Sequence, residues 1–243
     1  MTAPQLGLLV MAYGTPATPE DVEAFYTHIR RGNAPTPELL AELTGRYDAI
    51  GGVSPLAERT ESQRSALHAA LERYDPGRWV TRLGQKHAAP FIEDGVADLV
   101  AEGVEGIVGV VLAPHFSAFS VGQYHGRARA AAEEAQVSYV GIDRWFDLPA
   151  FIDHQATSLR DVLATMPDRS KVLFTAHSLP ERLLADDPYP DELADGAAAI
   201  AAAAGLGRWA DWGIAWQSAG RTPEPWRGPD LLEVIADLAA TGR

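Results

Sequence analysis

The sequence of 243 residues contains no cysteine. This absence excludes disulfide bonds, thiolate metal ligands and a cysteine nucleophile, so any metal ion must be bound through nitrogen or oxygen atoms. Because disulfides mark oxidising compartments, a chain without cysteine is compatible with the cytoplasm.

Basic residues are scarce. The chain has 20 Lys and Arg residues against 33 Asp and Glu residues, and its formal net charge is -13. Nucleic-acid binding depends on neutralising phosphates with Lys and Arg, so we expect no nucleic-acid partner.

Long hydrophobic runs are also absent. No stretch of about 18 uncharged apolar residues occurs, which excludes a predicted transmembrane helix. The N-terminal stretch MTAPQLGLLVMAYG has a short apolar run but lacks the basic region of a secretory signal. We therefore expect a soluble, cytoplasmic protein.

Several motifs of nucleotide and hydrolase chemistry are missing. The first predicted strand is followed by YGTPATPED, which lacks the G-x-G-x-x-G fingerprint of dinucleotide binding. The near match GLGRWA at residues 205–210 precedes a predicted strand instead of following one. P-loop, G-x-S-x-G and H-E-x-x-H motifs are absent, so nucleotide hydrolysis, serine esterase chemistry and zinc-dependent proteolysis have no support.

Short apolar runs alternate with longer segments of helical period, which predicts an α/β fold with parallel sheets flanked by helices. The predicted strands are residues 6–12, 79–85, 106–113, 138–143, 171–176 and 212–217. Three of these runs precede residue 115 and three follow residue 135. This distribution predicts two similar α/β halves, residues 1–115 and residues 116–243.

Polar side chains that can bind a ligand or take part in catalysis follow the predicted strands. Ligands of open α/β sheets bind beyond the carboxyl ends of the strands. Any single histidine there is more often a satisfied hydrogen-bonding residue than a ligand, and the histidines on predicted helices are expected to be solvated or packed. The number of such residues expected at one edge of the sheet nevertheless favours a ligand site. The residues that follow the strands include Tyr13, His87, His115, Arg144, His177 and Ser218.

Arginines cluster at the ends of the first two predicted helices, at Arg30, Arg31 and Arg46. One explanation is the helix dipole, because cations at helix C-termini are favoured by a few tenths to about 1 kcal/mol. The other is a rim of guanidinium groups that binds carboxylates through paired hydrogen bonds. The sequence alone leaves both open.

Long stretches of the sequence resemble the ferrochelatase family, in the bacterial form that acts on coproporphyrin. The resemblance runs from about residue 6 to residue 238 and is carried by GLLVMAYGTP, FYTHIRRG, RYDAIGGVSPL, KHAAPFIED, LAPHFSAFSVGQY, AHSLPERL, DPYPDEL and WQSAGRTPEPWRGPD. It implies two Rossmann-like halves that hold a tetrapyrrole in a cleft between them. The implied activity is insertion of Fe(II) into coproporphyrin III in haem biosynthesis.

The resemblance also implies roles for individual residues. His177 matches the histidine of the A-H-S-L-P motif, which lies at the metal site and takes pyrrole protons or hands over the metal. A neutral imidazole can do both, and partial burial keeps it neutral. Tyr13 resembles the tyrosine that meets the iron of the product haem from the opposite face.

Five further residues match positions that contact the propionates of the porphyrin: Arg30, Arg46, Tyr47, Ser54 and Tyr124. Coproporphyrin carries four carboxylates, which suits a rim of arginines. The implied partners are coproporphyrin III and ferrous iron as substrates. No iron–sulfur cluster is implied, since the cysteines that some relatives use for it are lacking.

By the same resemblance, relatives continue beyond the position of Arg243 with another strand, a helix that bears a catalytic glutamate, and a closing segment. We therefore expect the second half to lack its last elements and the chain to show weak or no chelatase activity while binding porphyrin. The acids Glu181, Asp186, Asp187 and Asp191 after His177 form either a solvated loop face or an iron route. The alternative functions are a porphyrin or haem carrier and a cobalt chelatase.

Overall fold

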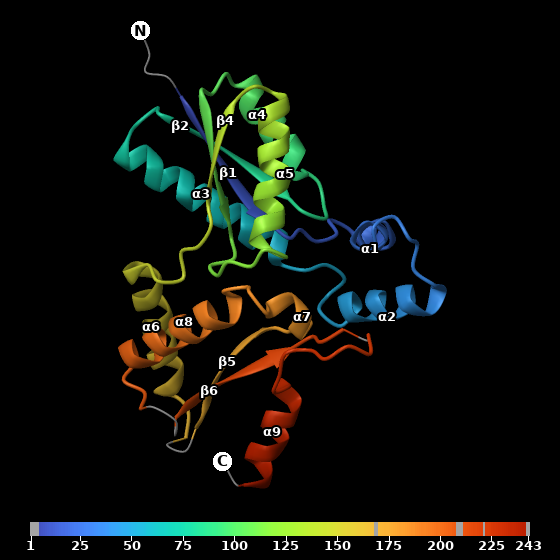
Figure 1. The fold of residues 1–243 in the computed structure, drawn as a ribbon, viewed down its shortest axis with the longest axis vertical. Coiled ribbons are helices and arrows are strands. Elements are labelled where there is room, and N and C mark those ends of the chain that lie inside the picture. The colour runs from blue at the N-terminus through green and yellow to red at the C-terminus, as the bar shows by residue number, and fades with distance from the viewer. Residues whose placement is uncertain (1–4, 168–169, 208–210, 221, 242–243) are drawn as a thin grey trace. The chain divides into compact units, whose positions relative to one another are not determined.

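The computed structural model describes residues 5–167, 170–207, 211–220 and 222–241 (Figure 1). Its contacts divide the chain into two compact units. Unit 1 is the chain up to Ala113 together with Val121–Asp143, and unit 2 is Pro114–Ser120 together with the chain from Arg144 onward. The α/β architecture with parallel sheets flanked by helices, predicted from the sequence, is confirmed.

Unit 1 contains a four-stranded parallel sheet in the order β2-β1-β3-β4. The strands are β1 (Leu6–Ala12), β2 (Trp79–Gln85), β3 (Gly106–Val111) and β4 (Ser138–Ile142). After Leu6, every residue of the inner strand β1 is buried. This burial explains its uninterrupted apolar sequence, because helices cover both faces of a parallel sheet.

Strand β4 pairs with β3, with Gly106 opposite Ser138 and Val110 opposite Ile142. The distribution of strands along the sequence predicts that this strand belongs to the second half, residues 116–243. Its pairing instead places residues 121–143 in unit 1, while Pro114–Ser120 belongs to unit 2.

The helices of unit 1 are α1 (Val22–Ile29), α2 (Pro37–Asp48), α3 (Leu56–Tyr74), α4 (Ile92–Ala101) and α5 (Val121–Glu134), with a short 3-10 turn at Pro19–Asp21. Helix α2 begins where the Thr36 side chain accepts a hydrogen bond from the Leu39 N–H at 3.4 Å, with proline in the first turn. Helix α4 buries Ile92, Val96 and Leu99 in the core. In Figure 1, α1 and α2 lie to one side of the sheet of unit 1.

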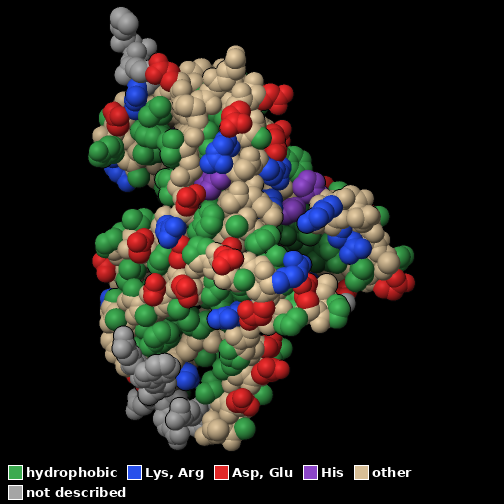
Figure 2. Space-filling model, viewed as in Figure 1, with side chains coloured by type: hydrophobic (Ala, Val, Ile, Leu, Met, Phe, Trp, Pro, Cys, Tyr) green, Lys and Arg blue, Asp and Glu red, His purple; other side chains and the backbone are tan. Residues whose placement is uncertain are grey.

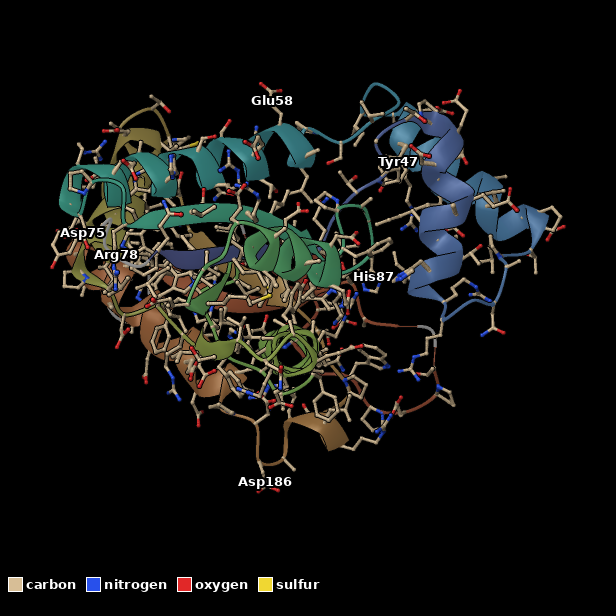
Figure 3. The ribbon with its side chains drawn as sticks, turned by 90° about the horizontal axis from the view of Figure 1, so that it is seen from above. Tyr47, Glu58, Asp75, Arg78, His87 and Asp186 are labelled. Atoms are coloured by element: carbon tan, nitrogen blue, oxygen red, sulfur yellow. The ribbon has the colours of Figure 1, made fainter. Side chains whose placement is uncertain are left out.

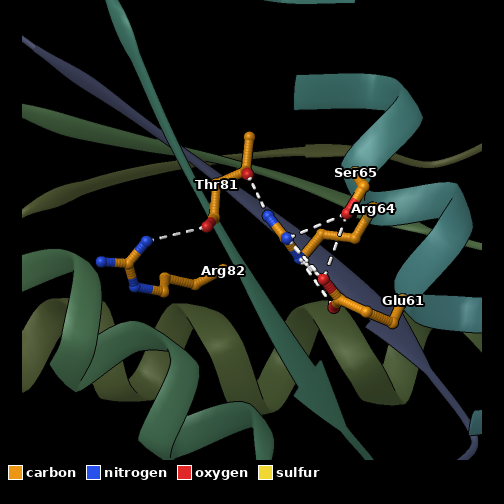
Figure 4. A network of polar contacts seen from close by, with 5 residues as sticks. All are labelled: Glu61, Arg64, Ser65, Thr81 and Arg82. Atoms are coloured by element: carbon orange, nitrogen blue, oxygen red, sulfur yellow. Dashed lines mark hydrogen bonds and ion pairs between the residues drawn. The ribbon is translucent and has the colours of Figure 1, made fainter. Parts of the chain in front are cut away.

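A polar network attaches α3 to β2 (Figure 4). Arg64 on α3 donates to the hydroxyl of the buried Thr81 at 2.7 Å and pairs with Glu61 one turn earlier. Arg82 donates to the Thr81 carbonyl oxygen at 3.0 Å. The guanidinium of Arg64 thus satisfies a buried hydroxyl that would otherwise cost free energy.

His125 on α5 is a packed histidine with both ring nitrogens engaged. Its Nε2 lies 3.2 Å from the Ile142 carbonyl oxygen and its Nδ1 lies 2.6 Å from the Tyr139 hydroxyl. A carbonyl oxygen only accepts, so Nε2 carries the hydrogen and Nδ1 accepts from Tyr139. Burial, as the largest cause, lowers the pKa of His125 and favours this neutral form.

Unit 2 contains the parallel strand pair β5 (Val172–His177) and β6 (Trp212–Gln217). Its helices are α6 (Pro149–Leu163), α7 (Glu181–Leu184), α8 (Tyr189–Ala203) and α9 (Leu231–Ala240). Ala176, Leu193 and Trp216 form a buried cluster on which Tyr189 and Ile214 pack. The alanine-rich helix α8 buries a narrow face, as its small side chains predict.

Candidate active site

His177 is the last residue of β5 and lies opposite Gln217 of β6 in the strand register. Its side chain is exposed, while its neighbours Ala176 and Ser178 are buried. Partial desolvation of the imidazole lowers the pKa of His177 below its usual value. The ring is therefore accessible and neutral at pH 7, the form that can bind a metal ion or accept a proton.

The segment after His177 is fixed to a second segment by main-chain and side-chain hydrogen bonds. Ser178 donates its N–H to the Gln217 carbonyl oxygen and its hydroxyl to the Arg227 carbonyl oxygen, each at 2.7 Å. The Arg227 N–H donates to the Leu179 carbonyl oxygen at 3.0 Å. These bonds hold the backbone of His177 in place without using the imidazole.

The acids that follow His177 do not form one group. Asp187 accepts hydrogen bonds from the Ser117 hydroxyl at 3.0 Å, the Ala118 N–H at 2.8 Å and the Tyr189 N–H at 3.0 Å. Asp186 is exposed and, in Figure 3, lies on a loop at the edge of the view. Asp187 therefore has a structural role, in holding residues 117 and 118 within unit 2.

Glu192 on α8 is buried and has a related role. One carboxylate oxygen accepts a hydrogen bond from the Phe116 N–H at 2.7 Å, and the other forms an ion pair with Arg144 at 2.8 Å. The second contact lacks hydrogen-bond geometry, so the charge of Arg144 is what compensates that oxygen. No sequence pattern marks Glu192, because the burial of a single acidic residue on a helix is not visible in the sequence.

His115 also lies in unit 2 but is packed. Its ring stacks on Phe146 with centroids 5.2 Å apart, and burial lowers the pKa of His115. A Cβ atom at Gly196 would lie 3.1 Å from its Nε2, so helix α8 approaches the ring closely. This strand-end histidine is part of the packing of unit 2.

In unit 1, Tyr13 follows β1 and is 46% exposed. Its ring contacts Phe25 edge-on, with centroids 6.4 Å apart, and lies 4.6 Å from the His87 ring. Partial burial and, to a lesser extent, the nearby Tyr47 raise the pKa of Tyr13. The chain turns away at Gly14, whose φ of 91° and closeness to Ala88 leave no room for a side chain.

Two further predicted residues are neighbours of Tyr13. The Tyr47 hydroxyl lies 3.4 Å from the Thr15 hydroxyl, and both are in unit 1. Tyr124 on α5 is buried, and burial followed by the charge of Tyr13 raises its pKa. The Lys86 amine lies 5.0 Å from the centre of the Tyr124 ring. Three phenols are thus gathered near the end of β1.

Arg30 and Arg46 both make local contacts. Arg30 follows α1 and donates from Nε to the Asn33 carbonyl oxygen at 3.2 Å. Arg46, in the last turn of α2, pairs with Glu42 at 2.6 Å, and its side chain is largely exposed. Ser54 accepts a hydrogen bond from the Leu56 N–H at 3.2 Å, at the start of α3. Each residue therefore has a local structural role in addition to any role in binding.

Six of the seven predicted site residues belong to unit 1, and His177 belongs to unit 2. Within the part of the chain that the structure describes, no group of three or more His, Cys, Asp and Glu residues could hold a metal ion.

These features define the class of the protein: an α/β protein with accessible groups at its strand ends, among them a neutral imidazole suited to metal or proton transfer. The profile of the ferrochelatase family matches residues 5–243. The chain therefore belongs to the ferrochelatase family, whose members are enzymes that insert a metal ion into a porphyrin. The resemblance noted from the sequence motifs is confirmed.

Three curated relatives show how close this similarity is. The chain is 47% identical to a protein of Halalkalibacterium halodurans, over 99% of this chain and 78% of the relative. It is 44% identical to a protein of Bacillus subtilis, over 98% and 78% of the two chains. It is 46% identical to a protein of Geobacillus kaustophilus, over 96% and 75%. All three relatives are named coproporphyrin III ferrochelatase.

No helix among the described residues is long and apolar enough to cross a membrane.

Proposed function

We propose that the chain binds coproporphyrin III and inserts Fe(II) into it, the reaction that the names of its relatives describe. The observation that carries the proposal is the accessible, neutral imidazole of His177 at the end of β5. Fe(II) is a substrate in this proposal and not a resident cofactor.

Two pyrrole N–H protons must leave the porphyrin as the metal ion enters, so a base is required. A neutral imidazole accepts a proton or binds Fe(II), but it does not do both with one nitrogen at the same time. We assign the role of the base to His177. The hydrogen bonds of Ser178 hold the main chain next to His177, so the backbone that carries the base is in position before substrate arrives.

The four carboxylates of coproporphyrin need cationic and hydroxyl partners. We propose that these partners are five residues of unit 1: Arg30, Arg46, Tyr47, Ser54 and Tyr124. Arg46 pairs with Glu42 on an exposed helix face, a contact of small free energy that a carboxylate of the substrate can replace. Tyr13 is assigned the contact with the metal of the product.

We also propose that the protein acts in the cytoplasm and holds no iron–sulfur cluster. The absence of cysteine supports both statements, since thiolates are the usual ligands of such clusters. The net charge of -13 supports the further proposal that no nucleic acid is bound.

A porphyrin carrier and a cobalt chelatase are the alternative functions. Neither is favoured, because the chain belongs to the ferrochelatase family and its relatives are named for ferrochelatase activity. A carrier would bind porphyrin without iron-dependent turnover, and a cobalt enzyme would prefer Co(II) to Fe(II) in the same assay.

The test is an anaerobic absorbance titration of the chain with coproporphyrin III, with and without Fe(II). We expect a shift of the porphyrin spectrum on binding, followed by iron insertion faster than in buffer. An unchanged porphyrin spectrum would overturn the proposal, and binding without any iron insertion would favour the carrier.

A further inference from the structure

Two histidines that are distant in the sequence meet in unit 1. His28 lies on α1 and His87 follows β2, yet their Nδ1 atoms are 3.0 Å apart. Their ring planes are inclined by 77° with centroids 5.2 Å apart. In Figure 3, the labelled His87 lies on the side of the sheet that faces α1. The pair is separate from His177, which belongs to unit 2.

The separation of the two nitrogens fits two arrangements. A hydrogen bond between them requires a hydrogen on one Nδ1 and a free lone pair on the other. Alternatively, both lone pairs can bind one metal ion: with metal–nitrogen distances of about 2.1 Å, two ligands at right angles lie about 3.0 Å apart. The second arrangement leaves a hydrogen on each Nε2.

Packing and main-chain bonds fix both rings. His28 stacks on Phe91, with centroids 5.2 Å apart and planes inclined by 26°, while His87 lies against Tyr13. The His87 N–H donates to the Tyr13 carbonyl oxygen at 3.0 Å, and the Lys86 N–H donates to the Ala12 carbonyl oxygen at 2.9 Å. The two nitrogens are therefore held near each other before any ion binds, which lowers the entropic cost of binding.

The pair is open to solvent and has space beside it. Both rings line a cavity of about 400 Å³, which Asp21, Phe25 and Phe91 also line. His28 is exposed and His87 is half-buried. On the face drawn in Figure 2, histidine and basic side chains lie close together on the surface over α1. A small hydrated cation can reach the two nitrogens.

Nearby charges must be counted, because cations oppose metal binding. Lys86 donates its amine hydrogen to Gln123 at 2.7 Å, and Arg127 pairs with both oxygens of Glu93 at 2.6 and 2.7 Å. The charge of Arg127 is thus largely compensated. Burial, followed by the charge of Lys86, lowers the pKa of His87 to about 4, so its ring is neutral at pH 7.

We propose that His28 and His87 form a two-imidazole binding site for a divalent transition-metal ion, with water in the remaining coordination positions. Imidazole suits Fe(II), Co(II), Ni(II) and Zn(II), whereas Mg(II) and Ca(II) need oxygen ligands. The site adjoins Tyr13, and on the basis of the proposed function we assign it the uptake of Fe(II) on the Tyr13 side of the porphyrin. That assignment rests on the proposed function, but metal binding by the pair does not.

The binding test uses Co(II), whose absorbance spectrum reports nitrogen ligands, and the chain without porphyrin. It is made in a His177→Ala background, so that His177 does not contribute. We expect one Co(II) ion per chain, and we expect His28→Gln and His87→Gln each to weaken binding at least tenfold. His154→Gln, at an exposed histidine of α6, is the matched control and leaves binding unchanged. Absence of binding, or binding indifferent to both substitutions, would overturn the proposal.

The assigned role is tested in the chain with His177 intact. We expect His28→Gln to raise the KM for Fe(II) severalfold while the KM for coproporphyrin stays the same. An unchanged KM for Fe(II) would overturn the uptake role, even where Co(II) binds to the pair. If the chain fails to insert iron at all, the proposed function fails, and the Co(II) titration still decides whether the metal site exists.

Discussion

The hydroxyl of Ser178 donates a hydrogen bond to the Arg227 carbonyl oxygen at 2.7 Å, immediately after the imidazole of His177. Ser178 is 1% exposed, so its hydroxyl has no water as a replacement partner. The end of β5 is therefore supported by the main chain of residues 225–227, to which Glu181 also donates its N–H. This support does not involve the imidazole of His177.

Replacement of His177 therefore separates chemistry from binding. We expect His177→Ala to reduce iron insertion to the rate in buffer, because the base is lost, and to leave coproporphyrin affinity within about twofold. Stopped-flow absorbance measures insertion, and fluorescence quenching measures affinity. The control is His154→Ala, on the exposed face of α6. Equal loss of insertion and binding would mean that His177 is a structural residue.

Two arginines test the recognition of carboxylates. Arg30→Ala and Arg46→Ala should each weaken coproporphyrin binding by about 1 to 3 kcal/mol, the value of a hydrogen bond to a charged group. Arg73→Ala removes a charge from the exposed last turn of α3 and serves as the control. Isothermal titration measures all three.

A second ligand distinguishes two roles of Arg30 and Arg46, the binding of substrate carboxylates and the stabilisation of helix ends through the helix dipole. The tetramethyl ester of coproporphyrin lacks the four negative charges, so its affinity should not respond to Arg30→Ala or Arg46→Ala. If neither substitution alters coproporphyrin binding, the arginines only stabilise the ends of α1 and α2.

Much of the fold could be predicted from the sequence, because strand length and apolar composition are local signals. The strands at residues 6–12, 79–85 and 212–217 have the predicted bounds, and β5 is displaced by one residue, so that His177 ends the strand instead of following it. The membership of β4 in unit 1 could not be predicted. It depends on pairing with β3, a contact between distant residues that leaves no pattern in either strand.

In the candidate site, too, single residues could be predicted from the sequence, whereas their burial and their contacts with distant residues could not. The resemblance predicted single residues, and their exposure or burial could not be anticipated: Tyr124 is buried, whereas Arg46 is exposed. The pairing of His28 with His87 was also invisible, since 59 positions separate them and a histidine on a helix is usually solvated or packed. The packing of α1 beside the end of β2 creates that contact.

The stability of unit 1 should depend on pH through His125. Its pKa is lowered in the folded protein, so the unfolded chain, with a histidine pKa near 6.5, binds the proton more readily. The contribution of this group is present above about pH 6.5 and is lost as the pH falls from 6.5 toward the lowered pKa. Urea unfolding between pH 8 and pH 5 should show this loss.

A substitution at His125 tests whether this residue causes the pH dependence of the stability of unit 1. In His125→Asn the dependence on pH should become weaker, whereas in His154→Asn it should stay as in the unsubstituted chain. An unchanged pH dependence in His125→Asn would show that other groups cause the loss of stability. The lowered pKa values of His87 in unit 1 and His115 in unit 2 act in the same direction. The unfolding of unit 1 is therefore followed through amide signals of β1 and β3, and only the part of the pH dependence that His125→Asn removes is assigned to His125.

Gly109 tests the packing beside His125. A Cβ atom at this position would lie 2.0 Å from the Tyr139 hydroxyl oxygen, which is held by its hydrogen bond to His125. Gly109→Ala should therefore destabilise unit 1 by about 1 to 3 kcal/mol, the usual cost of overpacking, as measured by urea unfolding. A Cβ atom at Gly126 on α5 would meet no other atom within 4 Å. Gly126→Ala should therefore stabilise the helix by up to about 1 kcal/mol. Equal effects of the two substitutions would show that the Tyr139 hydroxyl moves aside without cost, and that the hydrogen bond to His125 does not hold it.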